Sequence, residues 1–258
     1  MKKIALFILF IFLSTAMVQA AGNNYKDELK RIGYRYNIKA FIDAVMKSND
    51  QAFRYFLHST ISVNEQNKRG VTPLIAASIT GNNYYAQELI NVAGANPNIK
   101  TDVGDAALNY AAYHGNFDLV HFLVSKGANV DTVNQKGDSP LIQAVFVNRY
   151  DIVMYLLFVG AEPNLKNLLG NTALHYAASF GNLETVKVLV ANGADINSQN
   201  ELQETPLFIA SKNGRAKVVE YLLSTRKVDK KLTNFEGLYP LDIALKNHHE
   251  EIVNMLSK

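Results

Sequence analysis

A repeat of about 33 residues is the feature that most constrains the fold of this chain. Glycine, replaced once by glutamine, recurs at intervals of 34, 33, 33, 33 and 34 residues, at Gly70, Gly104, Gly137, Gly170, Gln203 and Gly237. The dipeptide Gly-Ala recurs every 33 residues, at Gly94, Gly127, Gly160 and Gly193. Two markers in one register indicate a repeated structural unit. Such a unit buries its apolar face only against its neighbours, so we expect a stack of repeats.

Each repeat encodes two short helices. Thr205 followed by Pro206 places a hydroxyl N-cap before a proline in the first helical turn. The first helix should end at a residue in the left-handed conformation, which glycine adopts most easily and asparagine next. Glycine occupies this place in most repeats and Asn148 in one, at Gly81, Gly115, Asn148, Gly181 and Gly214. Apolar residues at helical spacing, such as Val186 and Leu189, then predict the second helix.

The segment "TALHYAASFGNLETVKVLVANGADIN", residues 172–197, resembles an ankyrin repeat over nearly its whole length. The resemblance implies an all-α repeat solenoid of helix-turn-helix pairs joined by β-hairpin loops. We expect about six full repeats, named the first to the sixth, after a degenerate N-terminal cap repeat. Residues 21–39 precede this domain as a leading helix or a mobile lead-in. The ankyrin-repeat domain is expected over residues 40–258, with repeats near 40–66, 67–100, 101–133, 134–166, 167–199, 200–233 and 234–258.

Three departures from the repeat pattern carry expectations of their own. Ala106 stands where a hydroxyl N-cap is expected, which predicts a weaker helix start in the second repeat. Gln203 replaces glycine, which predicts a disturbed hairpin turn in the fifth. The fifth repeat also ends in "STRKVDKK" where Gly-Ala is expected. We therefore expect the junction between the fifth and sixth repeats to be the least regular.

The first twenty residues differ in character from the rest. Lys2 and Lys3 precede the ten-residue apolar run "IALFILFIFL", and Ala20 follows at the end of "STAMVQA". This layout predicts a signal peptide over residues 1–20, with cleavage after Ala20. An uncleaved anchor is the alternative, but the run is shorter than the roughly 20 apolar residues that span a bilayer. The expected product is a bacterial protein, periplasmic or secreted, with no stable membrane anchor.

Charge and residue pattern narrow the classes of function. Without Lys2 and Lys3 the chain has 24 basic and 23 acidic residues, so no basic surface for nucleic acid is predicted. His175 follows the family's Thr-x-Leu-His pattern, in which the histidine links neighbouring turns by hydrogen bonds. The histidines of "NHHEE", residues 247–251, occupy ordinary repeat positions. We predict no catalytic residue, no metal ligand and no cofactor.

Apolar residues at the variable positions indicate a partner-binding site. In the resembled family the hairpin tips and the two residues before the helix-ending glycine face the concave side. The predicted partner-binding residues are Val103, Tyr113, Phe146, Val147, Leu168, Leu169, Phe180, Leu202 and Phe235. The outer repeats place polar residues at the same positions, Lys68, Arg69, Lys212, Asn213 and Lys246. An apolar patch with a polar rim is typical of protein-binding surfaces. The alternative is packing between repeats, above all for Phe146.

The predicted function is that of a non-enzymatic protein–protein interaction module, monomeric, exported to the periplasm or outside the cell. It would bind an unidentified partner protein on its concave face. A secreted, host-directed ankyrin effector of a host-associated bacterium is the alternative. An enzyme or a metal-binding protein is the third possibility.

Overall fold

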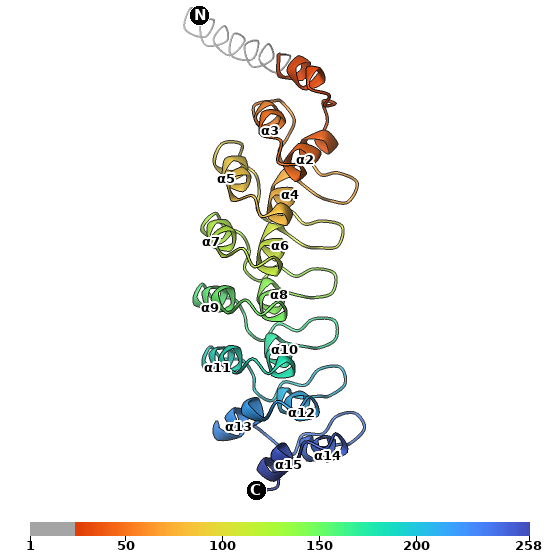
Figure 1. Ribbon diagram of the computed structural model, residues 1–258, viewed down its shortest axis with the longest axis vertical. Helices are drawn as coiled ribbons and strands as arrows, with labels where there is room; N and C mark the ends of the chain where they lie inside the picture. Colours follow the sequence, from red (N-terminus) through yellow and green to blue (C-terminus); the bar gives the residue numbers. More distant parts are fainter. Residues whose placement is uncertain (1–23) are drawn as a thin grey trace, which may run out of the picture. The chain divides into compact units, whose positions relative to one another are not determined.

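The computed structural model describes residues 24–258, and every regular element in this range is a helix (Figure 1). The predicted signal peptide and its cleavage position lie outside the described residues. The chain divides into two compact parts, one ending at Asp102 and the other beginning at Val103. The two parts are described separately below.

The N-terminal part holds the cap repeat and the first repeat. Residues 24–31 form a leading helix, whose Leu29 is fully buried. The cap repeat begins at Ile38, slightly before the expected residue 40. The helices that follow are α2 (Ile38–Met46), α3 (Asp50–Leu57), α4 (Pro73–Thr80) and α5 (Asn83–Asn91). The ring of Phe53 stacks on that of Tyr85 with centroids 3.9 Å apart, so aromatic packing joins the cap repeat to the first.

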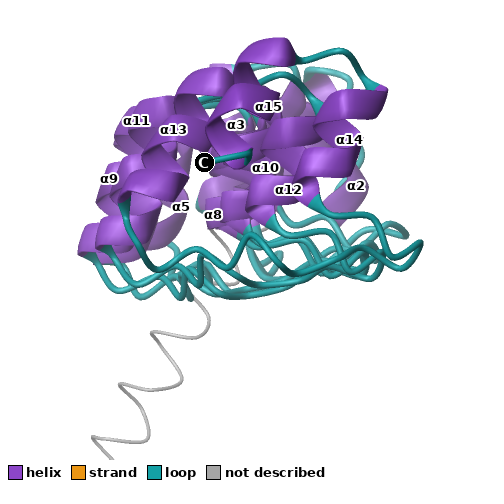
Figure 2. Cartoon of the chain, turned by 90° about the horizontal axis from the view of Figure 1, so that it is seen from below, coloured by secondary structure: helices purple, strands orange, loops and turns teal. Residues whose placement is uncertain are grey.

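The C-terminal part holds five further pairs of helices. Its first helices in each repeat are α6 (Ala107–Tyr113), α8 (Pro140–Phe146), α10 (Ala173–Phe180), α12 (Pro206–Lys212) and α14 (Pro240–Lys246). Its second helices are α7 (Phe117–Ser125), α9 (Tyr150–Phe158), α11 (Leu183–Ala191), α13 (Ala216–Ser224) and α15 (Glu250–Leu256). The first helices pack on one another in chain order and so do the second helices, which gives two parallel rows (Figure 1). The loops that join successive repeats extend to one side of the helices (Figure 2). The prediction of an all-α repeat fold is confirmed.

Capping chemistry explains where the first helices start. Thr72, Ser139 and Thr205 each precede a proline at the first helical turn, and each side-chain oxygen accepts the N–H three residues on. In the second repeat Ala106 has no side chain that can do this. Instead Oδ1 of Asn109 accepts the backbone N–H of Ala106 at 3.0 Å, which partly compensates for the missing cap.

The ends of the first helices show the expected left-handed backbone. Gly181 has φ 80° and Gly81 has φ 68°, as predicted for a helix-ending residue. Asn148 takes the same place with φ 57°, and His248 does so with φ 60°. The predicted helix boundaries are therefore confirmed at these positions.

The hairpin loops are held together by backbone hydrogen bonds from tip to tip. One N–H in each tip donates to the preceding tip, as from Leu168 to the carbonyl of Lys136 at 2.8 Å. The same bond joins the fifth and sixth repeats, from Phe235 to Leu202 at 3.0 Å. This stack of inter-repeat bonds fixes the spacing of the loops along the C-terminal part.

The expectation of a disturbed turn at Gln203 was wrong. Gln203 adopts φ 56°, and its N–H bonds to the carbonyl of Asn200 at 2.9 Å. The Oδ1 atom of Asn200 also accepts the N–H groups of Leu202 and Glu204, both at 2.9 Å, and so holds the turn without glycine. The other expected departure, "STRKVDKK" in place of Gly-Ala, does change the structure: just after α13 the N–H of Lys227 bonds to Oγ1 of its near neighbour Thr225 at 3.3 Å. The equivalent Ala194 instead bonds to the carbonyl of Leu189 at 3.0 Å.

Candidate functional site

Asparagine side chains form a ladder along the hairpins of the C-terminal part. Asn167 is typical: its Oδ1 accepts the N–H groups of Leu169 and Asn171, both at 3.0 Å. Its Nδ2 donates to Oδ1 of Asp138 in the preceding repeat at 2.8 Å and to the hydroxyl of Tyr176 at 2.9 Å. Asn134 repeats the arrangement by donating to Asp105 at 3.0 Å. Each asparagine thus shapes its own tip and ties it to the previous repeat.

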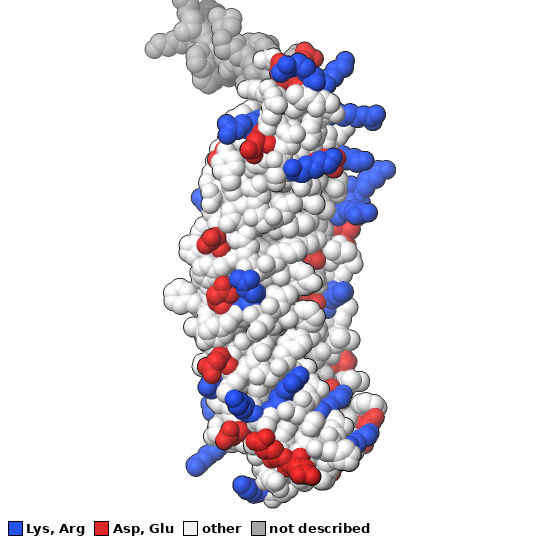
Figure 3. All heavy atoms as spheres, viewed as in Figure 1, with Lys and Arg blue, Asp and Glu red and all other residues white. Residues whose placement is uncertain are grey.

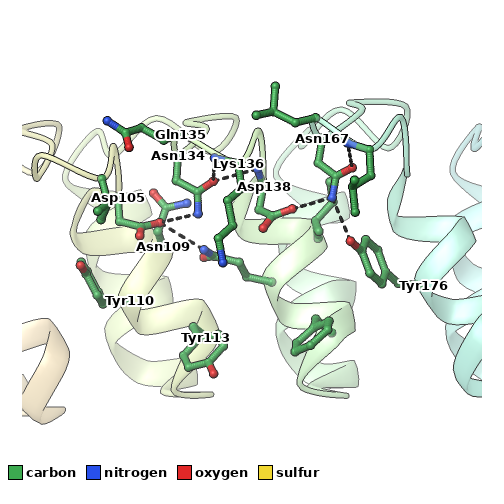
Figure 4. A pocket seen from close by; sticks show the side chains of 16 residues that line it. Asp105, Asn109, Tyr110, Tyr113, Asn134, Gln135, Lys136, Asp138, Asn167 and Tyr176 are labelled. Carbon is green, nitrogen blue, oxygen red and sulfur yellow. Dashed lines mark hydrogen bonds between the residues drawn. The ribbon is translucent and has the colours of Figure 1, made fainter. Parts of the chain in front are cut away.

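A groove of about 840 Å³ lies between these tips and the helices α6, α8 and α10 (Figure 4). In Figure 4 the carboxylates and amides run along the loops, while the ring of Tyr113 lies on the helix below them. Five of the predicted partner-binding residues line the groove, and about half or more of each side chain is exposed. They are Val103 (52%), Tyr113 (48%), Phe146 (52%), Leu168 (72%) and Leu169 (63%). We call this the central groove.

The other four predicted residues lie beside the central groove or away from it. The ring of Phe180 packs edge-on against Phe146 with centroids 5.7 Å apart. Leu202 lines a smaller hollow of about 350 Å³ that shares Leu169 with the central groove. Val147 is half-buried after the end of α8, and Phe235 is exposed at the last tip; neither lines either hollow.

Phe146 was the residue most suspected of filling a gap between repeats. It does touch the next repeat, through edge-on contacts with Tyr176 and Phe180 at centroid distances of 5.8 Å and 5.7 Å. Half of its surface nevertheless remains exposed to the central groove. Phe146 therefore packs between repeats on one side only.

The sequence interpretation missed the polar residues that line the central groove. Asp105 and Asp138 follow the tip glycines Gly104 and Gly137, and Gln143 projects from α8. Oδ1 of Asp105 accepts both Nδ2 of Asn134 and Nε2 of Gln143, at 3.0 and 3.2 Å. The recurrence of an acidic residue directly after the glycine was the available signal.

One protein-family model matches four overlapping stretches that together cover almost the whole described chain. A model described as ankyrin repeats (3 copies) matches residues 41–134, 85–167, 108–200 and 174–258. The chain belongs to the ankyrin-repeat family. Ankyrin repeats generally mediate protein–protein binding, and the family is typically non-enzymatic. No curated protein matches this sequence.

His175 has the structural role that the ankyrin pattern implies. Its side chain is almost fully buried, and Nδ1 accepts the N–H of Thr172 at 3.1 Å. Because a backbone N–H can only donate, Nδ1 carries no proton and Nε2 does. Nε2–H then donates to the carbonyl of Glu204 in the next ankyrin repeat at 3.2 Å. Burial lowers the pKa of His175 from 6.5 to about 4, so the ring stays neutral.

The remaining histidines that drew attention also serve the ankyrin framework. In "NHHEE", His248 provides the left-handed turn, and Nε2 of His249 lies 3.2 Å from the carbonyl of Lys212. Over residues 24–258, no group of three or more His, Cys, Asp or Glu residues is arranged to hold a metal ion. None of the helices in that same range has the length and apolar character needed to cross a membrane.

Proposed function

We propose that this ankyrin-repeat protein is a non-enzymatic interaction module that binds a partner protein in the central groove. The observation that carries this is the meeting of Val103, Tyr113, Phe146, Leu168 and Leu169 in one groove while all stay substantially exposed. Contiguous exposed apolar side chains on a soluble surface usually mark a recognition site. Aromatic anchors in such a site carry a large share of binding energy.

The surroundings of the central groove support this proposal. On the face seen in Figure 3, charged side chains are sparse over the middle of the molecule and denser over the last helices. The equivalents of Tyr113 and Phe146 in the fifth and sixth repeats are Lys212 and Lys246. An apolar centre beside a charged rim is the usual anatomy of a protein interface.

Affinity capture with matched variants tests the proposal. The protein is immobilised, exposed to extract from its source cells or their surroundings, and the bound proteins are identified by mass spectrometry. Tyr113→Ser combined with Leu168→Ser should lose the specific partner, because both side chains line the central groove. Phe158→Ser is the control, since Phe158 is 85% exposed on α9 and does not line the groove. If the unchanged protein, the double variant and the Phe158→Ser control all recover the partner equally, the binding site lies elsewhere.

We also propose export of the protein, with a signal peptide over residues 1–20. Support comes from the sequence alone, in Lys2 and Lys3, the following apolar run and Ala20. The intact mass of the protein from its native cells should correspond to a chain beginning at Ala21. A mass that still includes Met1–Ala20 contradicts cleavage. Fractionation into periplasm, medium and host cell distinguishes a periplasmic module from a host-directed effector.

A further inference from the structure

We propose that the central groove takes a basic side chain, lysine or arginine, from an extended segment of the partner protein. This inference rests on the proposed function and adds the chemistry of the partner. The cation would sit beside the carboxylates of Asp105 and Asp138, with the rings of Tyr113 and Phe146 as apolar walls.

The fifth repeat shows how such a site is filled. Glu204, nearly buried directly after its hairpin tip, forms an ion pair with Lys212 at the end of α12, with Nζ 2.9 Å from Oε1. In the repeat register, Asp138 and Asp105 occupy the place of Glu204. The place of Lys212 is occupied by Phe146 and Tyr113. The second and third repeats thus keep the acidic group and replace its internal cation by an aromatic ring.

Lys136 lines the central groove but forms no ion pair with either carboxylate. Among the described residues, no Lys, Arg or His forms an ion pair with Asp105 or Asp138. The groups that donate to their Oδ1 atoms are the neutral amides of Asn134, Gln143 and Asn167. Both carboxylates are half-buried beside apolar side chains, where reduced hydration strengthens the attraction for an incoming cation.

Two further features of the groove suit a basic side chain. Oε1 of Gln143 is a buried acceptor without a hydrogen-bond partner, so a guanidinium or ammonium N–H that reached it would satisfy it. The half-exposed rings of Tyr113 and Phe146 can contact the aliphatic stem and attract the charge of the same side chain. Each feature favours a cation over an acidic or purely apolar residue.

The charge of the surrounding repeats is complementary to such a partner. Residues 103–200 contain eight acidic and five basic residues, although the whole sequence has 26 basic and 23 acidic residues. The acidic excess is therefore concentrated in the repeats that build the central groove. A basic partner segment would be attracted to this region, and the attraction would weaken as salt is added.

Selection from a phage-displayed library of random peptides tests the inference, with the purified protein as bait. Selected peptides should be enriched in Lys or Arg flanked by apolar residues. Their affinity should fall at least tenfold for the double variant Asp105→Asn with Asp138→Asn. The control, Asp118→Asn with Asp151→Asn, removes the same charge from the exposed first turns of α7 and α9 and should bind as the unchanged protein does.

A second variant does not depend on the Asp substitutions being tolerated. Phe146→Lys should recreate the internal ion pair of the fifth repeat with Asp138, and so abolish selection of basic peptides while the melting temperature is kept. Phe146→Gln, which brings no charge, should retain a measurable preference for basic peptides. Equal loss of that preference in both variants would overturn the inference.

Two other outcomes separate the inference from the function on which it rests. The selected peptides could lack basic residues and bind the variant Asp105→Asn with Asp138→Asn with the same affinity as the unchanged protein. That result overturns the inference but leaves the groove as a binding site. If the unchanged protein selects peptides no better than the double variant Tyr113→Ser with Phe146→Ser does, the proposed function and the inference are both overturned.

Discussion

Five non-glycine residues of the described chain, among them Asn148, Gln203 and His248, adopt the left-handed backbone that glycine adopts in neighbouring repeats. Such a conformation costs a non-glycine residue about 1–2 kcal/mol. Surrounding hydrogen bonds hold such a turn in place despite this cost. Around Gln203, Oδ1 of Asn200 accepts the N–H groups of Leu202 and Glu204. The repeat position therefore predicts the conformation better than the residue type does, which is why reading Gln203 as a disturbance failed.

Substitution of Gly181 tests the helix end in the fourth repeat. A β-carbon there would meet Cδ of Arg215 at 2.9 Å, a flexible side chain that can move, so the main cost is the left-handed backbone with φ 80°. Gly181→Val should lower the free energy of unfolding by about 1–2 kcal/mol or more, measured by chemical denaturation. Asn148→Gly should be neutral or mildly stabilising. If Gly181→Val is as stable as the unchanged protein, the assigned helix boundary is wrong.

The buried His175 predicts a pH dependence of stability. Because its pKa falls from 6.5 to about 4 on folding, the unfolded chain binds the proton more readily between these values. The contribution of neutral His175 to stability should be fully present above pH 6.5. The free energy of unfolding should then fall by up to about 3 kcal/mol as the pH decreases to 4. His175→Asn should flatten this slope, since Asn109 makes the equivalent cap in the second repeat. The control is His121→Gln, an exposed position on α7, where the slope should persist.

At the scale of elements, the helices were predictable and the hairpin network was not. Caps such as Thr205 and end positions such as Gly181 act through neighbouring backbone, so the local sequence contains the information. The ladder bond from Asn167 to Asp138 joins residues 29 apart in two repeats. Sequence alone showed asparagine and aspartate in loops, where both are common for local reasons, and so gave no reason to pair them.

The asparagine ladder predicts a marked cost for one small substitution. Asn167→Ala would leave the N–H groups of Leu169 and Asn171 without their acceptor and Asp138 without its amide donor. We expect a loss of about 1–3 kcal/mol in the free energy of unfolding. Asn192→Ala is the control, because that exposed side chain only donates to the carbonyl of Val188. It should change stability by less than about 0.5 kcal/mol. Equal effects of the two substitutions would show that the ladder adds no stability.

At the scale of the whole molecule, periodicity predicted the repeat number and the packing partners, because a repeat has only its neighbours to pack against. The apolar half of the central groove followed from the same register, since Tyr113, Phe146, Leu168 and Leu169 occupy variable positions. The acidic half did not, because the uncompensated charge of Asp105 and Asp138 becomes apparent only beside the Glu204–Lys212 pair of the fifth repeat.

The central claim is that the exposed aromatic side chains in the groove, and Phe180 beside it, serve binding more than folding. Comparing the melting temperature with the dissociation constant of the captured partner for Tyr113→Ala, Phe146→Ala and Phe180→Ala tests it most directly. Tyr113→Ala and Phe180→Ala should each weaken binding by about 2 kcal/mol, roughly 30-fold, with little change in melting temperature. Phe146→Ala should weaken binding and cost clearly less stability than the roughly 3–5 kcal/mol of a fully buried phenylalanine. If all three variants instead lose stability together and the folded fraction binds normally, the groove is ordinary packing between repeats and the account is wrong.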